Sequence, residues 1–294
     1  MALETDLLIE RRRLKRRLGG WRAAALALLL LGGAALLAPS LPGGDHVARI
    51  TLRGFIGEDA RLLRALDEAA EDSSIRAVIV AIDSPGGSVA GGEAMHAAIA
   101  RLRAAGKPVA AVMGGTAASA GYMVALPAER IFAREATLTG SIGVLLQSFE
   151  ASELMARLGV RAESLASGPL KDQPSPFRPL TEEGRAALAA VIADMQAQFV
   201  AKVMAGRGME EARVRAIADG RVMSGRQALA AGLVDAIGGE REARDWLASA
   251  HGVAKDLPVE ELDARSRAER LLDASAGAFW RAGVQALAPL SLPR

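Results

Sequence analysis

The sequence predicts an α/β fold in which a mostly parallel sheet carries helices on its faces. Short apolar segments alternate with amphipathic ones from residue 46 onward, which is the pattern of repeated strand–helix units. One segment, "IRAVIVAID" at 75–83, is apolar almost throughout, as are strands that are buried on both faces. Glycines follow two of the expected strands, in "SPGG" and "GGTAASAG", and they allow the chain to turn sharply there.

The individual elements follow from hydrophobic periodicity and from start and stop residues. The first half of the chain is expected to hold a strand at 46–54, a helix at 59–72, a strand at 75–83, a helix at 88–105, a strand at 107–114, a short helix at 119–127 and a strand at 142–146. From residue 181 the pattern changes to helices, which are expected at 182–206, 209–218 and 224–233. The last of these begins at a capping serine and is closed by Gly232.

Composition argues against several classes of function. The chain has 294 residues, of which 51% are hydrophobic and 24% charged, and this is enough for one large or two modest domains. The net charge is only +2 and aromatic residues make up 3%, which argues against binding of nucleic acid. The absence of cysteine excludes disulfides, thiolate metal sites and a cysteine nucleophile. Because His46, His96 and His251 include no pair at ligand spacing, no metal site is expected. The sequence also gives no reason to expect an organic cofactor.

An apolar segment near the N-terminus predicts a membrane anchor. Residues 23–41 carry no charge and are long enough to cross a bilayer as a helix. Basic residues from Arg11 to Arg17 precede this segment, and the positive-inside rule then leaves the N-terminus in the cytoplasm. In a Gram-negative cell the chain would cross the inner membrane once and place its main domain in the periplasm. A cleaved signal peptide is the alternative, although no small-x-small cleavage site is clear.

The expected organisation has five parts. They are a basic cytoplasmic segment at 1–22, the transmembrane anchor at 23–41, a linker at 42–46, one large folded domain at 47–250 and an amphipathic extension at 251–294. The extension contains Phe279 and Trp280 side by side. A helix of this kind packs against its own domain, against a partner or on a membrane surface.

Two glycine-containing turns hold the residues that are candidates for chemistry. Ser119 lies in "GGTAASAGYM", after an expected strand and at the start of an expected helix. Gly86 and Gly87 follow another strand in the same way, and ligands of open α/β sheets bind beyond the carboxyl ends of the strands. Backbone N–H groups in such turns can hold an oxyanion. From the local sequence alone, the simpler reading of Ser119 is a helix cap or packing residue, and that of the two glycines is a turn.

A serine nucleophile needs a base, and lysine usage narrows the choice. Only five of the 36 basic residues are lysine. Arginine keeps its proton in proteins, whereas a lysine can act as a base once burial lowers its pKa. Lys171 stands out because its segment, "LASGPLKDQPSPFRPLTEEG", is too apolar for a flexible linker. A solvent-facing loop lysine is the alternative that loop composition leaves equally open.

Taken together, these residues resemble the signal peptide peptidase A family in its short, single-repeat form. The shared motifs, in the family's order between residues 47 and 250, are "DSPGGSV", "TAASAGYM", "LTGSIGV", "SGPLKDQPSPFRPLTEEG" and "GRVMSGRQALAAGLVDAIGG". The resemblance implies a ClpP/crotonase-like fold. It also implies a membrane-anchored serine endopeptidase that degrades released signal peptides, which makes 47–250 the protease domain.

The same resemblance implies a role for each motif residue. Ser119 would be the nucleophile and Lys171 the general base of a Ser-Lys dyad that works through an acyl-enzyme, without a cofactor or metal. Ser141 would orient the lysine, and the N–H groups of Gly86 and Ala120 would form the oxyanion hole. The family commonly has glycine where Ala120 stands. Its subunits assemble as a dome-like homo-oligomeric ring, so Ser119 and Lys171 would meet across an interface between copies.

Three other functions are compatible with these motifs. Crotonase-like hydratases use paired N–H groups of the same fold to hold a thioester enolate, but the expected export of this chain argues against that activity. A non-catalytic membrane scaffold would keep the fold and assembly without reacting with serine-directed probes. A sister protease that trims the tails of membrane proteins would use the same catalytic motifs on a different substrate.

Overall fold

The computed structural model describes residues 14–23, 26, 44–262 and 264. The chain divides into two units, one formed by Met1–Gly43 with Arg265–Arg294 and the other by Gly44–Ala264. Residues 14–23 and 26 of the first unit are helical. The expected anchor at 23–41, apart from residues 23 and 26, and the end of the extension from residue 265 lie outside the described residues.

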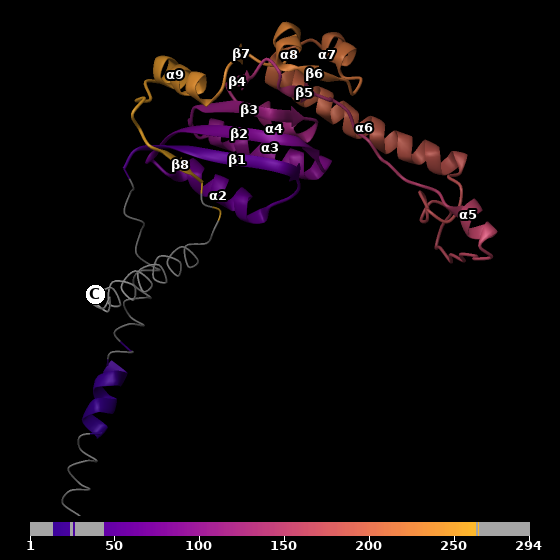
Figure 1. Cartoon of the computed structure of the whole chain (residues 1–294), viewed down its shortest axis with the longest axis horizontal. Helices are drawn as coiled ribbons and strands as arrows, with labels where there is room; N and C mark the ends of the chain where they lie inside the picture. Colours follow the sequence, from indigo (N-terminus) through magenta and orange to yellow (C-terminus); the bar gives the residue numbers. More distant parts are fainter. Residues whose placement is uncertain (1–13, 24–25, 27–43, 263, 265–294) are drawn as a thin grey trace, which may run out of the picture. The chain divides into compact units, whose positions relative to one another are not determined.

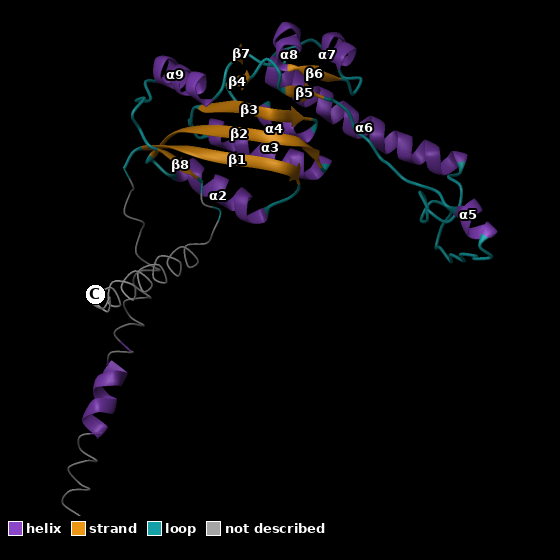
Figure 2. Ribbon diagram, in the orientation of Figure 1, coloured by secondary structure: helices purple, strands orange, loops and turns teal. Residues whose placement is uncertain are grey.

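The second unit is built on a mostly parallel sheet (Figures 1 and 2). Its strands are β1 (His46–Ile56), β2 (Ile75–Gly87), β3 (Val109–Ala118), β4 (Arg130–Ala133), β5 (Leu138–Gly140), β6 (Val222–Ser224), β7 (Ala236–Ile237) and β8 (Val259–Glu261). The order is β6-β5-β3-β2-β1-β8, with β4 between β3 and β7. Only the β5–β6 pair is antiparallel. The predicted α/β class with a mostly parallel sheet is therefore confirmed.

The helices of the second unit include all those that the periodicity predicts, together with α5 (Ser152–Arg157) and α9 (Glu240–His251), which it does not predict. The others are α2 (Ala60–Glu71), α3 (Val89–Ala104), α4 (Ala120–Ala125), α6 (Glu182–Arg207), α7 (Glu211–Ile217) and α8 (Gly225–Ala231). Local capping fixes several boundaries. The Ser88 hydroxyl accepts from the N–H of Gly91 at the start of α3, and Ser224 forms a capping box at the start of α8. Left-handed glycines at 208 and 232 end α6 and α8.

The two faces of the sheet bury separate apolar cores. Alternate residues of a strand point to opposite faces, and in β2 the side chains of Val78, Val80 and Ile82 join one core while Ala77 and Ile79 join the other. Helices α2, α3, α4 and part of α6 cover the first face, and α9 covers the second. This double coverage explains why the β2 segment is apolar throughout.

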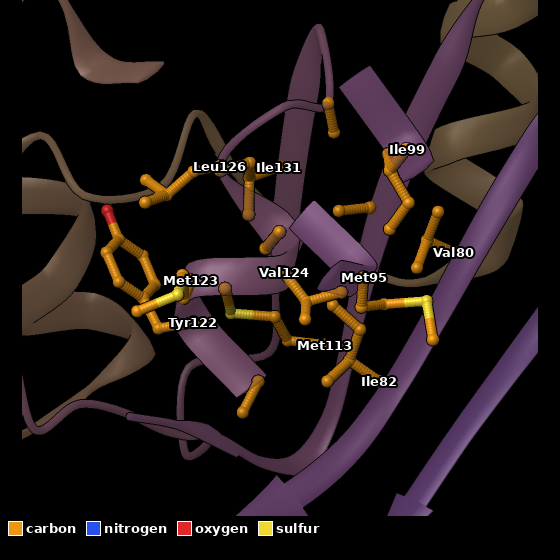
Figure 3. Close-up of a cluster of buried hydrophobic side chains, with 14 of the residues drawn as sticks. Val80, Ile82, Met95, Ile99, Met113, Tyr122, Met123, Val124, Leu126 and Ile131 are labelled. Carbon is orange, nitrogen blue, oxygen red and sulfur yellow. The ribbon is translucent and has the colours of Figure 1, made fainter. Parts of the chain in front are cut away.

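Helix α4 lies inside the larger core (Figure 3). All six of its residues are buried, and Figure 3 shows its side chains beside Ile82, Met95 and Met113. The hydroxyl of Tyr122 donates to the carbonyl oxygen of Leu233 at 2.9 Å. Because α4 begins directly after Ser119, this packing fixes the position of the serine.

One expected strand is wrong. The segment 142–146 contains no strand, and residues 141–150 follow an irregular path. Strand β5 lies just before it and ends where Gly140 and Ser141 adopt positive φ angles of 74° and 49°, which stops regular extension. Ile142 is fully buried in the larger core, whereas Leu145 is 82% exposed, so only the start of this apolar segment is buried within one chain.

Helix α6 is the described helix that is long and apolar enough to cross a membrane by length and composition. Its C-terminal half, however, contributes Phe199, Val200 and Val203 to the core of the second unit. Gly206 lies so close to Leu126 that a Cβ there would come within 2.8 Å of the Leu126 carbonyl oxygen. The C-terminal half is therefore a packed part of the second unit.

Burial of His96 predicts a loss of stability in mild acid. Desolvation on α3, with a smaller contribution from the charge of Lys202, lowers the pKa of His96 to about 4. The unfolded chain, in which the pKa of a histidine is about 6.5, binds this proton more readily. The free energy of unfolding should therefore fall as the pH falls from about 6.5 towards about 4. Denaturant unfolding at several pH values should show that the free energy of unfolding falls less steeply with pH in His96→Gln than in wild type. Equal declines in the two proteins would contradict the prediction.

Candidate active site

A pocket of about 750 Å³ lies at the carboxyl ends of the parallel strands. It contains both serines that the sequence singles out, Ser119 and Ser141, together with Gly86. The full lining is Phe55, Pro85, Gly86, Gly87, Val89, Ser119, Ser141, Gly143, Val144, Leu145, Ile192, Gln196, Ala218, Asp219 and Gly220. Part of this lining lies at the ends of β1, β2, β3 and β5, which is where ligands of α/β sheets bind, and the rest comes from α3, α6 and the segments after β5 and α7.

Ser119 occupies a strained turn between β3 and α4. Its φ and ψ angles are 54° and −121°, and Ser119 and Ser141 are the two non-glycine residues with positive φ among the described residues. Such conformations are costly and persist where the surrounding structure fixes them. The N–H of Ser119 donates to the carbonyl oxygen of Gly140, and its own carbonyl oxygen accepts from Met123, both at 2.9 Å.

The side chain of Ser119 does not cap α4. The residue stands at the N-cap position, yet its hydroxyl accepts no hydrogen bond from the helix. By contrast, the N-cap hydroxyls of Ser88 and Thr181 each accept one from the backbone. Capping therefore does not account for a serine at position 119. The hydroxyl is half-buried and belongs to the pocket wall.

The Gly86 turn lies directly against the serine. A Cβ built on Gly86 would lie 3.0 Å from the Cβ of Ser119 and 3.3 Å from its Oγ. The φ angle of Gly86 is 131°, which favours glycine. Its N–H donates to the Ser84 hydroxyl at 3.1 Å, and that hydroxyl donates to the carbonyl oxygen of Gly54 at 2.6 Å. Ser84 is fully buried and fixes the turn, a role that the sequence pattern alone does not indicate.

Ala120 is the first residue of α4, and its methyl group points away from the pocket. A Cβ on Gly92 of α3 would lie 3.0 Å from the Ala120 Cβ. The methyl therefore packs beside Gly92 within the core and does not narrow the pocket. As a first-turn residue, Ala120 has an N–H without an acceptor inside the helix.

Ser141 lies beside Ser119 through the backbone of β5. Strand β5 pairs with the end of β3, and this pairing carries the Ser119-to-Gly140 hydrogen bond. The N–H of Ser141 donates to the carbonyl oxygen of Arg221 at 2.8 Å, which joins this turn to the segment before β6. The structure thus brings Ser119, Ser141 and Gly86 together around one pocket.

An acidic residue that no sequence motif marks also lines the pocket. Asp219 accepts hydrogen bonds from the side chain of Arg221, and these hold its pKa at about 2. Its carboxylate is therefore ionised throughout the neutral range, and the guanidinium of Arg221 accompanies it. No pattern in the local sequence marks this pair, because its place depends on the turn between α7 and β6.

Lys171 does not line the pocket within one chain. Its side chain is exposed in the segment before α6. The nearby Gln173 packs against Gly184 and accepts from the N–H of Thr181, so this segment lies at the N-terminal end of α6. The pocket touches α6 only at Ile192 and Gln196, and Ile192 is about 12 Å along the helix axis from Gly184 at 1.5 Å per residue. Figure 1 shows the loop and α5 beside this distant end of α6.

The segment that carries Lys171 exposes much apolar surface. We refer to residues 144–191, which comprise the loop, α5 and the first part of α6, as the arm. Leu165 is 95% exposed and Phe149 80% exposed. The other exposed large apolar side chains of the arm are Leu145, Leu146, Leu154, Leu158, Val160, Leu170, Phe177 and Val191. So many large exposed apolar side chains in one segment are typical of an interaction site.

Comparisons with known families agree with this site. The profile of Peptidase family S49 matches residues 101–254, and that of Clp protease matches residues 59–139. The first match includes Ser119, Ser141 and Lys171, and the second includes Gly86 and Ser119. The Clp protease match agrees with the α/β architecture and the mostly parallel sheet of the second unit.

Individual relatives are proteases by name. A Synechocystis protein named as a protease is 39% identical over 212 residues, which cover 71% of this chain and 76% of that protein. An Enterococcus faecium protein named as signal peptide peptidase SppA is 35% identical, with coverage of 63% and 54%. Protease 4 of Salmonella typhi is 36% identical, with coverage of 63% and 30%, so the match spans less than a third of that longer protein. By the profile match and by these relatives, the chain belongs to peptidase family S49.

Proposed function

We propose that this chain is a membrane-anchored serine endopeptidase that degrades released signal peptides and other apolar peptides. The observation that carries the proposal is the conformation of Ser119. It is a strained, uncapped serine at a strand-to-helix turn, it lines a pocket, and Gly86 leaves open space against its hydroxyl. Membership of peptidase family S49 supports the same reaction class.

In the proposed mechanism the Ser119 oxygen attacks the carbonyl carbon of a peptide bond. Lys171, in its uncharged form, accepts the hydroxyl proton and later delivers it to the leaving amine. The resulting acyl-enzyme is hydrolysed by a water molecule that the same amine activates, which restores the free serine. The Ser141 hydroxyl, at the neighbouring turn, orients the lysine.

Backbone N–H groups hold the negative charge that develops on the carbonyl oxygen. One donor is the N–H of Ala120, at the first position of α4. The Gly86–Gly87 turn supplies the other. Since the N–H of Gly86 donates to Ser84 and that of Ser88 donates to Ile56 in β1, alternation along the strand turns the N–H of Gly87 towards the serine. We therefore propose that the N–H of Gly87 is the second donor. The absence of a side chain at Gly86 leaves the space that admits the oxyanion.

The base reaches the serine from a neighbouring copy in this proposal. Lys171 is exposed on the arm and distant along α6 from the pocket of its own chain. A head-to-tail interface repeated around a ring lets the arm of one copy cover the pocket of the next. The exposed apolar side chains of the arm supply the contact surface. Burial at this interface also favours the uncharged form of an amine.

The pocket supports apolar substrates. Phe55, Val89, Val144, Leu145 and Ile192 form apolar walls beside the serine. Peptides left in or near a membrane after protein export are rich in such side chains. An anchor at 23–41 places the protease where these peptides are released.

Peptide hydrolysis by the full chain in detergent tests the proposal. Wild type should cleave an apolar signal-peptide sequence faster than a polar peptide of equal length. A fluorophosphonate should label Ser119, as identified by mass spectrometry. Ser119→Ala should lower kcat by about 1,000-fold or more, because no other group replaces the nucleophile.

Ser249→Ala is the matched control, because this hydroxyl donates to the Trp246 carbonyl within the exposed surface of α9. It should hydrolyse the peptide at the wild-type rate. Labelling of another serine, or hydrolysis that survives in Ser119→Ala, would show that the nucleophile lies elsewhere.

A further inference from the structure

The antiparallel ladder between β5 and β6 ends at the serine pocket, and the two segments that follow it line one side of that pocket. The paired residues are Leu138 with Ser224, Thr139 with Met223 and Gly140 with Val222. The hydrogen bond from Ser141 to Arg221 extends the ladder by one step. Beyond it the two segments, 141–143 and 218–220, continue along the pocket without pairing directly.

The side chain of Gln196 spans the gap where this ladder stops. Its Nε2 donates to the carbonyl oxygen of Ala218 at 2.9 Å and to that of Ile142 at 3.4 Å. One amide from α6 thus joins both segments, just beyond the last direct bond between them. Gln196 itself lines the pocket together with Ser141 and Asp219.

The oxygen atom of the same amide lies in an unfavourable environment. The Oε1 atom of Gln196 is buried and has no hydrogen-bond partner. Rotating the amide by half a turn would not help, because it would place Oε1 against two carbonyl oxygens. A buried acceptor without a partner lowers stability, and an apolar side chain of similar size would avoid this cost. The two hydrogen bonds that Nε2 donates must therefore offset the cost of burying the Oε1 atom of Gln196 without a partner.

We propose that Gln196 is a positioning residue for substrate binding, because it holds segments 141–143 and 218–220 together as one wall of the pocket. The inference rests on the proposed function, since it takes the pocket beside Ser119 as the site of an apolar peptide. It assigns to Gln196 no contact with the reacting atoms. Loosening this wall should weaken peptide binding more than it slows the chemical step.

Two substitutions test this role in different ways. Gln196→Met keeps the length of the side chain but removes both donated bonds. Gln196→Glu keeps the shape but faces the carbonyl oxygens of Ile142 and Ala218 with a carboxylate, which repels them. We expect KM for an apolar peptide to rise about tenfold in the methionine variant and further in the glutamate variant, with kcat within about threefold of wild type.

Gln198 offers a matched control on the same helix. Its Nε2 makes one exposed hydrogen bond, to Asp194 at 2.8 Å, and it does not line the pocket. Gln198→Met and Gln198→Glu should leave KM within about twofold of wild type. Thermal unfolding of all four variants separates a loss of global stability from a specific loss of binding.

A binding measurement keeps the test independent of hydrolysis. In the Ser119→Ala background, fluorescence anisotropy of a labelled apolar peptide should give a Kd about tenfold weaker with Gln196→Met than without it. If wild type hydrolyses no peptide, the proposed function fails while this comparison still decides the role of Gln196. The proposal is overturned if Kd and KM are unchanged, or if kcat alone falls. It is also overturned if the pocket with Gln196 intact binds no peptide, or if both Gln196 variants fail to fold.

Discussion

Lys171→Arg is expected to abolish peptide hydrolysis while the chain stays folded and assembled. Arginine retains the positive charge and a similar length, but its guanidinium does not release a proton under these conditions. Loss of a general base lowers kcat by about 100-fold to 10,000-fold. Steady-state hydrolysis of an apolar peptide measures the effect. Size-exclusion chromatography reports whether the assembly persists.

Lys255→Arg is the control for this substitution. Lys255 pairs with Asp245 on the exposed surface around α9, so the same chemical change there should leave the activity unaltered. If Lys171→Arg retains a tenth or more of the wild-type kcat, Lys171 is not the general base.

Mixing two inactive variants then locates the base relative to the serine. In co-expressed Ser119→Ala and Lys171→Ala chains, a pocket is complete where the serine comes from one variant and the lysine from the other. With random mixing in a head-to-tail ring, one junction in four meets this condition, so about a quarter of the wild-type activity should return. A dyad formed within each chain predicts no recovery, because neither variant holds both residues.

The mixed assemblies need direct proof. Different affinity tags on the two variants allow the mixed species to be purified in two steps before assay. Activity in that fraction supports a pocket shared between copies. An inactive fraction that contains both chains would contradict it and would require the arm to fold back on its own pocket.

The sequence was most informative where the signal was local. Periodicity and capping residues predicted the strands and helices from residue 46 to the start of α4, and the turn before α4 is where Ser119 lies. These features depend on residues that are near one another in the chain. The same locality explains why Ser119 could be placed at a strand end beside Gly86, since both follow parallel strands of one sheet.

The arm could not be predicted in this way. The apolar segment 142–146 has the composition of a strand, and composition alone does not tell whether apolar side chains are buried by their own chain or by another copy. Gln196 carries no local signal either. Its bonds to Ile142 and Ala218 join residues that are 54 and 22 positions away. Such contacts arise only when helix α6 is docked on the finished sheet.

Gly86→Ala is expected to lower kcat/KM by about 100-fold or more, an effect as large as the loss of a donor in an oxyanion hole, because the added methyl group fills the space that admits the oxyanion. The added Cβ would lie 3.0 Å from the Ser119 Cβ, 3.3 Å from its Oγ and 3.4 Å from the Ala118 carbonyl oxygen. The first two contacts are tighter than nine in ten real Cβ contacts, and the methyl would occupy the space beside the nucleophile. Labelling of Ser119 by a fluorophosphonate should slow in parallel, because that reagent needs the same space.

Gly106→Ala separates the loss of space from the strain of the backbone. Gly106 also has a positive φ, 81°, but a Cβ there would meet no atom within 4 Å. This variant should lose about 1 kcal/mol of stability, the usual cost of a side chain at such a φ, and should keep the wild-type kcat/KM per folded chain. Gly86→Ala carries at least this strain, because its φ of 131° lies further from the left-handed helical region, and it also obstructs the serine. If both variants lose stability alike and both remain active, the Gly86 turn does not border the reacting carbonyl, and the assignment of the oxyanion hole to this turn is wrong.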